Sequence, residues 1–434
     1  MSNEFKSGLS RRSFMRTLGA ASVAATSFPM LAAAQGTSAA TQLGGRGAND
    51  TGARRGMGMG MMAMPADVTV ISGNENPLGP APSALTAIYD TAKLGGRYHG
   101  EISYQTITTF NNIFGLKPAT ATTAGYVGLF PGSGGPLDLA LMSNIGPDKP
   151  LVYADPSYEQ GPRAAEVMKA PKFPVKLTPT YAHDVKAMLA AHPSPGAYYI
   201  VNPNNPTGTM TPKADIVWLL KNKPKGSVVI VDEAYHHFSN DDSCIDLVAA
   251  DQDIIVTRTF SKIYGMAGLR AGVAVARPDL LARFATAVPV ARSLASISIT
   301  SAAAAKASLE DKDLISLRRK INADNRTETL EFLTKHGFTI IPGSQANFFM
   351  VDVKRPGRDF ASLMMDEKVA IGRTWPAMPT YVRVTVGTRD EMAKFQSAFV
   401  KCMDKPSTTV NGAASLHMPQ FHIPSELYRG EVNA

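Results

Sequence analysis

The 434-residue sequence contains only two cysteines, and they lie far apart. Cys244 and Cys402 form no CxxC pair and no metal-ligand spacing, so the sequence offers neither a cysteine redox motif nor a cysteine-rich metal centre. A disulfide between the two is an alternative in an oxidising compartment. We expect two buried free thiols instead.

The chain also carries only a small excess of positive over negative charge. Charged residues make up 18% of the chain and hydrophobic residues 44%, and the formal net charge is +8. This composition is typical of a globular protein rather than a disordered or membrane one, and the length allows two domains with a large core. Removal of residues 1–34, which we expect, would leave 40 basic and 35 acidic residues. So mild and dispersed an excess indicates no nucleic-acid site.

The first 34 residues resemble an export signal. The segment Ser10–Arg16, SRRSFMR, is similar to the twin-arginine motif, and a weakly apolar stretch at 18–31 precedes three alanines. The stretch is short for a membrane span and has no charge to anchor it. A chance basic N-terminus is the alternative. The resemblance implies passage through the twin-arginine machinery, which carries folded proteins, and thus a periplasmic or exported location.

Residues 35–64 are low in complexity and rich in glycine, alanine and methionine. We expect a disordered linker here. Five methionines between 57 and 64 alternate with glycine and alanine, and thioethers are soft ligands, so Cu(I) binding is conceivable. A flexible tether is the simpler interpretation, and we prefer it.

Four apolar runs in the middle of the chain end in polar residues. The runs and the residues that follow them are Ile254–Val256 with Lys262, Tyr198–Val201 with Asn205, Val228–Val231 with Asp232 and Tyr235, and a shorter run from Leu151 with Tyr158. Strands that are apolar along their whole length belong to parallel sheets covered by helices on both faces. Ligands bind such sheets beyond the carboxyl ends of the strands. We therefore expect these polar residues to converge on one crevice.

The converging residues suit one cofactor. Lys262 lies beside apolar and glycine-rich sequence, where partial desolvation lowers the pKa of an amine and makes it a candidate Schiff-base former. Asp232 fits the carboxylate that keeps a pyridine nitrogen protonated. The remaining parts are Asn205 and Tyr235 as donors to a ring oxygen, Tyr158 as a stacking face, and Ser261 with Arg270 as a phosphate site. Together they predict pyridoxal 5'-phosphate.

The motifs NPNNPTG, VDEAYHHF, TFSKIYGMAGLRAG and YVRVTVGT resemble those of fold-type-I aminotransferases, most closely the histidinol-phosphate aminotransferase branch. GNENPLGP at 73–80 is similar to the same branch, and the resemblance extends to about residue 388. It implies an α/β fold in which helices sandwich a mostly parallel sheet, with a smaller α/β domain beside it. It also implies transamination between an amino donor and a 2-oxo acid acceptor, with Lys262, Asp232 and Tyr235 catalytic.

The resemblance adds residues at the cofactor phosphate. The turn 131–136 before an expected helix at 137–143 resembles the family's phosphate loop, where backbone N–H groups approach an anion, so Ser133 and Gly134 are implied there. Tyr98 is similar to a tyrosine that reaches across a dimer interface to the partner's cofactor phosphate, which implies a homodimer. A surface tyrosine is the alternative. The sequence departs from the family after Tyr98, because HGE at 99–101 replaces a proline and an acid.

Four residues are implied for the substrate. Arg383, in a strand expected at 381–386, matches the residue that holds the α-carboxylate, since a fixed guanidinium binds a carboxylate bidentately. Arg373 resembles a second residue for a substrate anion. Asn347 and Asn76 are expected in the same pocket. A surface salt bridge is the alternative for either arginine.

We predict six parts along the chain. They are a signal (1–34), a linker (35–64), an N-terminal segment joining the small domain (65–97), a large cofactor-binding domain (98–320), a C-terminal small domain (321–404) and a tail (405–434). Helices are expected at 82–92, over 278–320 and at 322–336, and alternating strands at 338–341, 347–353 and 381–386. We find no internal repeat.

Two other functions are compatible with parts of this pattern. A decarboxylase similar to threonine-phosphate decarboxylase would use the same cofactor, and an exported, noncatalytic binding protein could retain the fold. The intact set of Lys262, Asp232, Asn205, Tyr235 and Arg270 argues against the second. The adjacent His236 and His237 would point apart on an extended chain, so we expect no metal site. An exported enzyme of this kind would take up its cofactor in the cytoplasm before leaving.

Overall fold

A computed structural model describes residues 64–120, 124–287 and 296–405 of the chain. The predicted export signal, the linker up to residue 63 and the tail beyond residue 405 lie outside the described residues. The fold that follows therefore concerns the region that carries all the predicted site residues.

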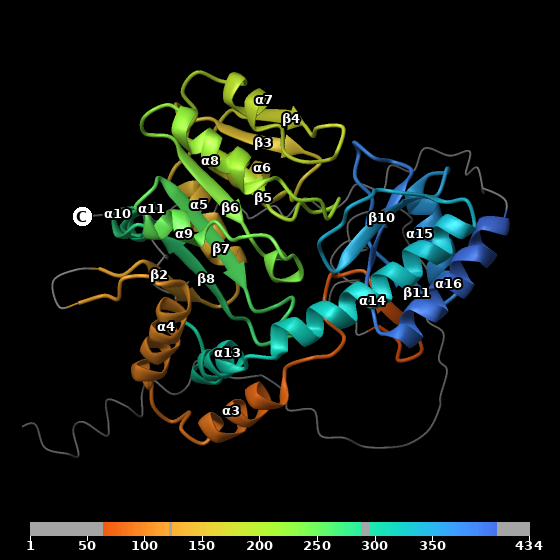
Figure 1. Ribbon diagram of the computed structural model, residues 1–434, viewed down its shortest axis with the longest axis horizontal. Coiled ribbons are helices and arrows are strands. Elements are labelled where there is room, and N and C mark those ends of the chain that lie inside the picture. The colour runs from red at the N-terminus through yellow and green to blue at the C-terminus, as the bar shows by residue number, and fades with distance from the viewer. Residues whose placement is uncertain (1–63, 121–123, 288–295, 406–434) are drawn as a thin grey trace, which may run out of the picture. The chain divides into compact units, whose positions relative to one another are not determined.

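A seven-stranded sheet forms the centre of the larger domain (Figure 1). Its strands, in spatial order, are β2 (Val127–Phe130), β8 (Gly272–Ala276), β7 (Ile254–Thr259), β6 (Val228–Asp232), β5 (Ala197–Val201), β3 (Leu151–Asp155) and β4 (Lys172–Lys176). Neighbours from β7 to β4 are parallel, whereas β8 is antiparallel to both β7 and β2. The prediction of a mostly parallel sheet is confirmed, and β8 is the strand that runs against the others. The connection at 260–271 contains no helix to cross over the sheet, so the chain returns antiparallel.

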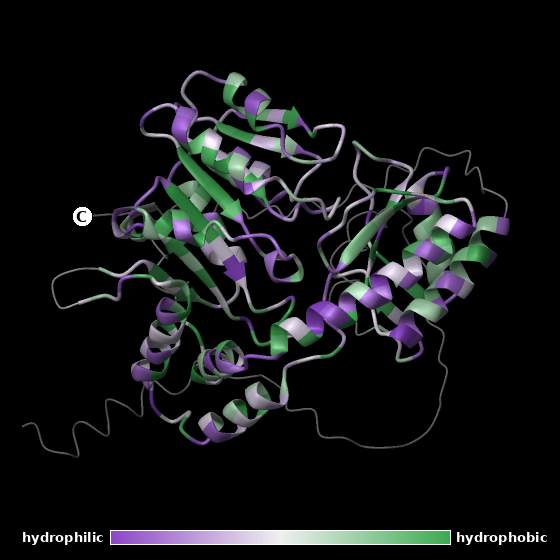
Figure 2. Cartoon of the chain, viewed as in Figure 1, coloured by the Kyte–Doolittle hydropathy of each residue, from purple (hydrophilic) through white to green (hydrophobic). Residues whose placement is uncertain are grey.

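Both faces of this sheet are buried. Tyr198 and Ile200 of β5 lie in one core and Tyr199 and Val201 in the other, because successive side chains of a strand point to opposite faces. Helices in the first core are α3 (Pro82–Ala92), α4 (Gly100–Phe114), α7 (Val185–Ala190), α8 (Lys213–Asn222), α9 (Ile245–Ala249) and α13 (Ile299–Glu310), with the short η1 (His236–Phe238). Helices in the second are α5 (Gly134–Met142), α6 (Gln160–Val167), α10 (Pro278–Ala282) and α11 (Phe284–Ala287). Two-sided burial explains why the central strands are apolar along their length, as Figure 2 shows in green.

The smaller domain has its own sheets and its own core. Its strands are β12 (Tyr381–Thr385), β10 (Phe348–Asp352) and β9 (Thr339–Ile340) in one antiparallel sheet, and β1 (Thr69–Ile71) paired in parallel with β11 (Val369–Ile371). Its helices are α14 (Leu314–Lys335), α15 (Gly357–Asp366) and α16 (Arg389–Asp404). We expected alternating strands, but all five residues of β10 are buried. Phe348 packs in the first core of the large domain and Phe349 in the core of the small domain, so both faces of β10 are covered.

Helix α14 joins the two domains. It begins at Leu314, eight residues before the expected start at 322, because Leu314 is already buried in the large-domain core. Leu333, near its other end, packs in the small-domain core. The predicted boundary between 320 and 321 thus falls inside one continuous helix. In the N-terminal segment, β1 belongs to the small domain whereas α3 packs with the large one, and the exact domain limits stay a prediction.

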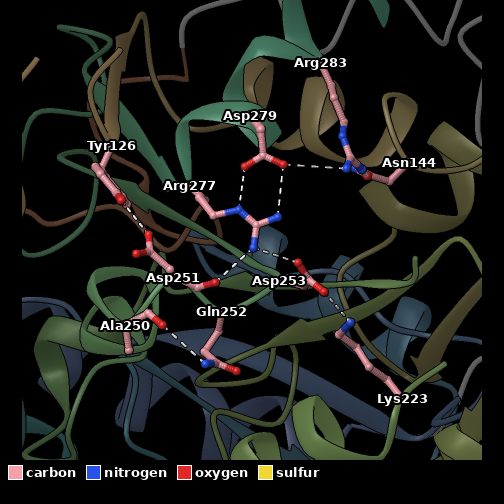
Figure 3. A network of polar contacts seen from close by, with 10 residues as sticks. All are labelled: Tyr126, Asn144, Lys223, Ala250, Asp251, Gln252, Asp253, Arg277, Asp279 and Arg283. Carbon is pink, nitrogen blue, oxygen red and sulfur yellow. Dashed lines mark hydrogen bonds and ion pairs between the residues drawn. The ribbon is translucent and has the colours of Figure 1, made fainter. Parts of the chain in front are cut away.

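Polar side chains connect the strands at the end of the sheet opposite the carboxyl end of β7 (Figure 3). Arg277, just after β8, donates to both carboxylate oxygens of Asp279, at 2.5 and 3.0 Å. Its Nη1 also lies 3.0 Å from Asp253, just before β7. Tyr126, just before β2, donates to Asp251 at 2.5 Å. These contacts tie together the connections that enter and leave three neighbouring strands.

Two further findings bear on the expectations above. Cys244 and Cys402 are buried free thiols, as expected. Within the described ranges, no helix combines the length and the apolar character needed to cross a membrane.

Candidate active site

A cavity of about 480 Å³ lies at the carboxyl ends of β5, β6 and β7. The predicted site residues in its wall are Ser133, Gly134, Tyr158, Asn205, Asp232, Tyr235, Ser261, Lys262, Arg270, Arg373 and Arg383. They come from both domains, since Arg373 and Arg383 follow or belong to small-domain strands. The structure therefore brings together all the predicted site residues except Asn76, Asn347 and Tyr98, and Tyr98 was expected to reach a partner's site rather than this one.

Lys262 follows β7 and places its amine in this cavity. Its Nζ lies 5.4 Å from the centre of the Tyr235 ring and 3.4 Å from the carbonyl oxygen of Gly73. Burial, and secondarily the nearby Arg383 cation, lowers the pKa of Lys262 to about 8. A lysine in this state is partly neutral near physiological pH and can act as a nucleophile or a base.

Asp232 is the last residue of β6 and is almost completely buried. Its Oδ1 accepts hydrogen bonds from the backbone N–H of Ala234 (3.1 Å) and the hydroxyl of Thr257 (3.3 Å), which leaves Oδ2 available among the described residues. Burial raises the pKa of Asp232 to about 6, despite these bonds and the charge of Lys262. A cation placed against Oδ2 would favour the ionised form.

Tyr235, Tyr158 and Asn205 line the cavity beside these charges. The Tyr235 hydroxyl accepts a hydrogen bond from Nδ2 of Asn74 (3.0 Å), so its own proton is free to be donated. Asn205 Oδ1 accepts from Nη1 of Arg383 at 2.8 Å. Burial raises the pKa of Tyr158 to about 12, so its ring stays neutral. Neutral aromatic and amide groups thus lie beside the charged side chains of Lys262 and Asp232.

One end of the cavity combines the N-terminus of a helix with an arginine side chain. Helix α5 begins there, and its N-cap, Ser133, makes no side-chain capping bond, so the first N–H groups of the helix are available. Gly132 just before it has φ of +85°, and a Cβ at this residue would lie 2.2 Å from Nη2 of Arg270. Arg270 donates to the carbonyl of Ala267 (2.9 Å) and, at 3.4 Å, to Ser261 Oγ. The glycine lets the loop approach the guanidinium and form one site.

The two arginines from the small domain differ in their partners. Arg383 is buried and donates to two neutral oxygens, Asn205 Oδ1 and the carbonyl of Ser72 (2.7 Å). Burial lowers its pKa to about 10, and its Nε has no partner among the described residues. Arg373 instead forms an ion pair with Glu159. Both guanidinium groups lie over the ring of Trp375, at 5.3 and 4.8 Å respectively.

Three predicted residues do not line this cavity. Asn76 donates to the carbonyl of Ile263 (3.0 Å), directly after Lys262. Asn347 donates to the carbonyls of Asn74 and Glu75. Both amides therefore hold backbone segments that border the cavity. Tyr98 is 99% exposed and is not part of this chain's own cavity wall.

Some residues at the site were missed by sequence reasoning. Gln160 lines the cavity and donates to the carbonyl of Gly134 at 2.6 Å, which ties α6 to the first turn of α5. Glu159 and Gln160 directly follow Tyr158. A search of the polar residues after this apolar run that continued two residues further would have found them. Trp375 and Asn74 carried no such signal. Within the described residues, no group of three or more histidine, cysteine, aspartate or glutamate side chains is placed to hold a metal ion.

Comparison with known proteins agrees with this geometry. The family model for class I and II aminotransferases matches residues 66–399. Histidinol-phosphate aminotransferase 1 of Nitrosococcus oceani is 33% identical over 330 residues, which cover 75% of this chain and 86% of that protein. The structure of a putative histidinol-phosphate aminotransferase from Erwinia carotovora atroseptica aligns with a TM-score of 0.72 and 30% identity, over 78% of this chain and 98% of that one.

A more distant structure shares the fold. Histidinol-phosphate aminotransferase from Sinorhizobium meliloti, solved in complex with pyridoxal-5'-phosphate, aligns with a TM-score of 0.68 and 23% identity, over 77% of this chain and 91% of that one. The family match spans both domains and every residue of the cavity wall. The chain therefore belongs to the class I and II aminotransferases, a family of pyridoxal-phosphate-dependent enzymes.

Proposed function

We propose that this aminotransferase binds pyridoxal phosphate in the cavity described above and moves an amino group between an amino acid and a 2-oxo acid, with Lys262 as its reactive amine. The observation that carries the proposal is the convergence of three groups on one cavity. They are the amine of Lys262, the buried carboxylate of Asp232 and the buried guanidinium of Arg383. Lys262 offers a nucleophile, Asp232 a partner for the ring nitrogen of the cofactor, and Arg383 a site for the carboxylate of the substrate.

The residues present fit the cofactor. Asp232 is ionised at high cost in its buried position, and a cationic ring nitrogen beside it would offset that cost. The open N-terminus of α5 and the guanidinium of Arg270 offer donors and positive charge for a phosphate. Tyr158 supplies an aromatic face and Tyr235 a free hydroxyl proton. When bound, pyridoxal phosphate supplies an aldehyde that condenses with amines and a ring that accepts electrons from the substrate's α-carbon.

The chain's own residues then position the substrate and move a proton. Arg383 binds the α-carboxylate, because it is a buried cation whose partners in the described residues are neutral. This contact fixes the α-carbon near Lys262. With a pKa of about 8, the Lys262 amine is basic enough to take the α-proton, and once protonated it is acidic enough to give that proton up again.

Substitution of Lys262 tests the proposal. In Lys262→Ala we expect oxo-acid formation from amino donors to be lost while pyridoxal phosphate still binds without a covalent bond. Lys320→Ala removes an exposed lysine of α14 and should leave activity unchanged. Full activity of Lys262→Ala would refute the role of the lysine. Release of carbon dioxide without an oxo acid would instead support the decarboxylase alternative.

We also propose that the protein acts as a homodimer in which Tyr98 reaches the partner's cofactor phosphate. Support comes from exposed apolar side chains in the segment that runs from α3 into α4. They are Leu85 (53% exposed), Tyr89 (80%), Leu94 (42%), Tyr98 (99%) and Tyr104 (58%). Exposed apolar groups gathered in one segment are typical of an interaction surface.

A mixing experiment tests this arrangement. Lys262→Ala and Tyr98→Ala subunits each lack one part of a site, but a mixed dimer contains one site with both parts. We therefore expect mixing after mild dissociation to restore activity above that of either variant alone. Lys262→Ala mixed with Asp232→Asn serves as the control, because both residues belong to the same subunit's cavity and neither site of a mixed dimer is complete. A monomeric protein, or no gain on mixing, would refute the proposal.

Finally, we propose that the protein is exported through the twin-arginine machinery after it has folded with its cofactor. The support is the sequence of residues 1–34, which lie outside the described residues. Replacing both Arg11 and Arg12 by lysine should retain the full-length protein in the cytoplasm in cell fractionation. An unchanged distribution would show that the pair is not a signal.

A further inference from the structure

The substrate end of the cavity contains one arginine that is free to bind an anion and one that is not. Arg383 has neutral hydrogen-bond partners in the described residues, whereas Arg373 is paired with the carboxylate of Glu159. About a third of each of the paired side chains is exposed, so the pair lies at the cavity rim rather than deep inside. The two arginines therefore do not offer two equivalent anion sites.

The pair is held in place from several sides. Arg373 follows β11 of the small domain and lies 4.8 Å from the centre of the buried Trp375 ring. Glu159 is the N-cap residue of α6 in the large domain, where the helix dipole favours a negative charge. It follows Tyr158, which lines the cavity. The ion pair thus connects the two domains beside the entrance.

An anionic group of a substrate that approached Arg373 would meet Glu159. It would have to displace a carboxylate that is already bonded to the guanidinium, and the displaced charge would remain close by. The negative charge of Glu159 also acts on Arg383, deeper in the cavity. Repulsion between the Glu159 carboxylate and a nearby anionic group of the substrate should weaken substrate binding by about tenfold or more.

We propose that Glu159 is a specificity-determining residue that excludes amino donors with a phosphate or a second carboxylate and favours donors with an uncharged side chain. This inference rests on the proposed function in that Arg383 holds the α-carboxylate. The side chain of the donor then extends toward Arg373, whose charge Glu159 neutralises. Donors with an anionic side chain are thus excluded although Arg373 is present, because the carboxylate of Glu159 already occupies its guanidinium.

The test uses two unreactive acids and the protein loaded with pyridoxal phosphate. 3-Phenylpropionate carries one carboxylate and an uncharged end, and succinate carries a carboxylate at each end. By titration calorimetry, we expect the wild-type protein to bind 3-phenylpropionate more tightly than succinate. In Glu159→Gln, the affinity for succinate should rise about tenfold, while that for 3-phenylpropionate changes by less than about threefold.

Matched variants show whether the gain in succinate affinity comes from removing the negative charge of Glu159. Glu166→Gln is the same substitution on the same helix, at an exposed residue paired with Lys172, and should leave both affinities unchanged. Glu159→Asp keeps the charge and should not gain succinate affinity. Adding Arg373→Gln to Glu159→Gln should remove the gain, because the freed guanidinium is what binds the second carboxylate.

The inference is overturned if wild-type protein binds succinate as tightly as 3-phenylpropionate, or if Glu159→Gln leaves the ratio of the two affinities within twofold. Because the acids are not turned over, this result does not depend on catalysis. Oxo-acid formation from phenylalanine and from aspartate is measured separately on the same proteins. A wild-type protein that forms no oxo acid from any amino donor would refute the proposed function, whereas an unchanged affinity ratio in an active enzyme would refute only the role of Glu159.

Discussion

Replacing Arg383 by glutamine separates substrate binding from folding. Arg383 is buried, and in the described residues its hydrogen-bond acceptors are the neutral oxygens of Asn205 and Ser72. Such a cation is costly for the protein alone and useful only when an anion binds. We therefore expect Arg383→Gln to reduce kcat/KM strongly while the stability of the cofactor-free protein hardly changes.

The structure gives the size of both effects. A lowering of the Arg383 pKa from 12.5 to about 10 corresponds to roughly 3 kcal/mol against the charged form in the folded chain. Glutamine relieves this cost but gives up two hydrogen bonds from a charged donor, worth about 1.5 kcal/mol each, and contacts with the rings of Trp375 and Phe348, worth about 0.5–1 kcal/mol each. These contributions cancel to within about 1–2 kcal/mol. Loss of a bidentate, charge-assisted pair with the substrate should lower kcat/KM by about 10²–10³-fold.

Thermal unfolding of the cofactor-free variant and steady-state kinetics with an amino donor check both parts. The melting temperature should stay within about 3 °C of the wild type. Arg389→Gln removes an arginine that is 79% exposed and paired with Glu328, and should change neither quantity. If Arg383→Gln melts more than about 10 °C lower, or keeps kcat/KM within threefold of the wild type, Arg383 is a structural residue and not the carboxylate site.

Three further predictions concern the cofactor end of the cavity and the opposite end of the sheet. Gly132→Ala puts a Cβ against the Arg270 guanidinium at a residue with positive φ. The Kd for pyridoxal phosphate in fluorescence titration should therefore rise about tenfold or more. An unchanged Kd would show that the loop can move away without loss of binding. Because the pKa of Lys262 is lowered to about 8, the neutral fraction of its amine grows as the pH rises toward that value. Covalent attachment of pyridoxal phosphate to the cofactor-free protein should therefore accelerate about tenfold per pH unit and level off above about pH 8. An attachment rate that stays flat from about pH 6 to 8 would contradict this. Arg277→Gln removes the ion pairs with the half-exposed Asp279 and with Asp253 and should cost about 1–2 kcal/mol in urea unfolding at pH 7. Since Arg277 holds the pKa of Asp279 below its usual range, this stabilisation is complete above about pH 4 and is lost as the pH falls through the lowered pKa, so a loss that persists undiminished at lower pH would refute it.

The position of the site was predictable because it follows from the sheet. Asp232 ends β6 and Lys262 follows β7, and parallel strands place their carboxyl ends at one edge. Apolar runs bounded by polar residues are a local signal, so one sequence suffices to find them. The antiparallel return of β8 was not predictable in the same way, because its residues are as apolar as those of the parallel strands.

Partners from distant parts of the chain were beyond the reach of sequence patterns. Glu159 and Arg373 are 214 residues apart and come from different domains, so no periodicity relates them. Asn76 and Asn347 were recognised as polar residues near the site, but a sequence does not tell whether an amide donates to a ligand or to backbone. Here both donate to backbone. The sequence thus identified residue types at the site better than it identified their partners.

Two consecutive carboxylates show how this fold distinguishes a structural charge from a reactive one. Asp232 and Glu233 are 4% and 1% exposed, so both pay a similar cost of burial. Although burial pushes the pKa of Glu233 upward, its ion pair with the buried Arg258, at 2.8 Å, holds that pKa below the usual value. Asp232 has no ion pair within the described ranges, and burial raises its pKa to about 6. A fold that pairs one buried carboxylate fully and leaves its neighbour facing a cavity keeps the second available for a charge that a ligand brings.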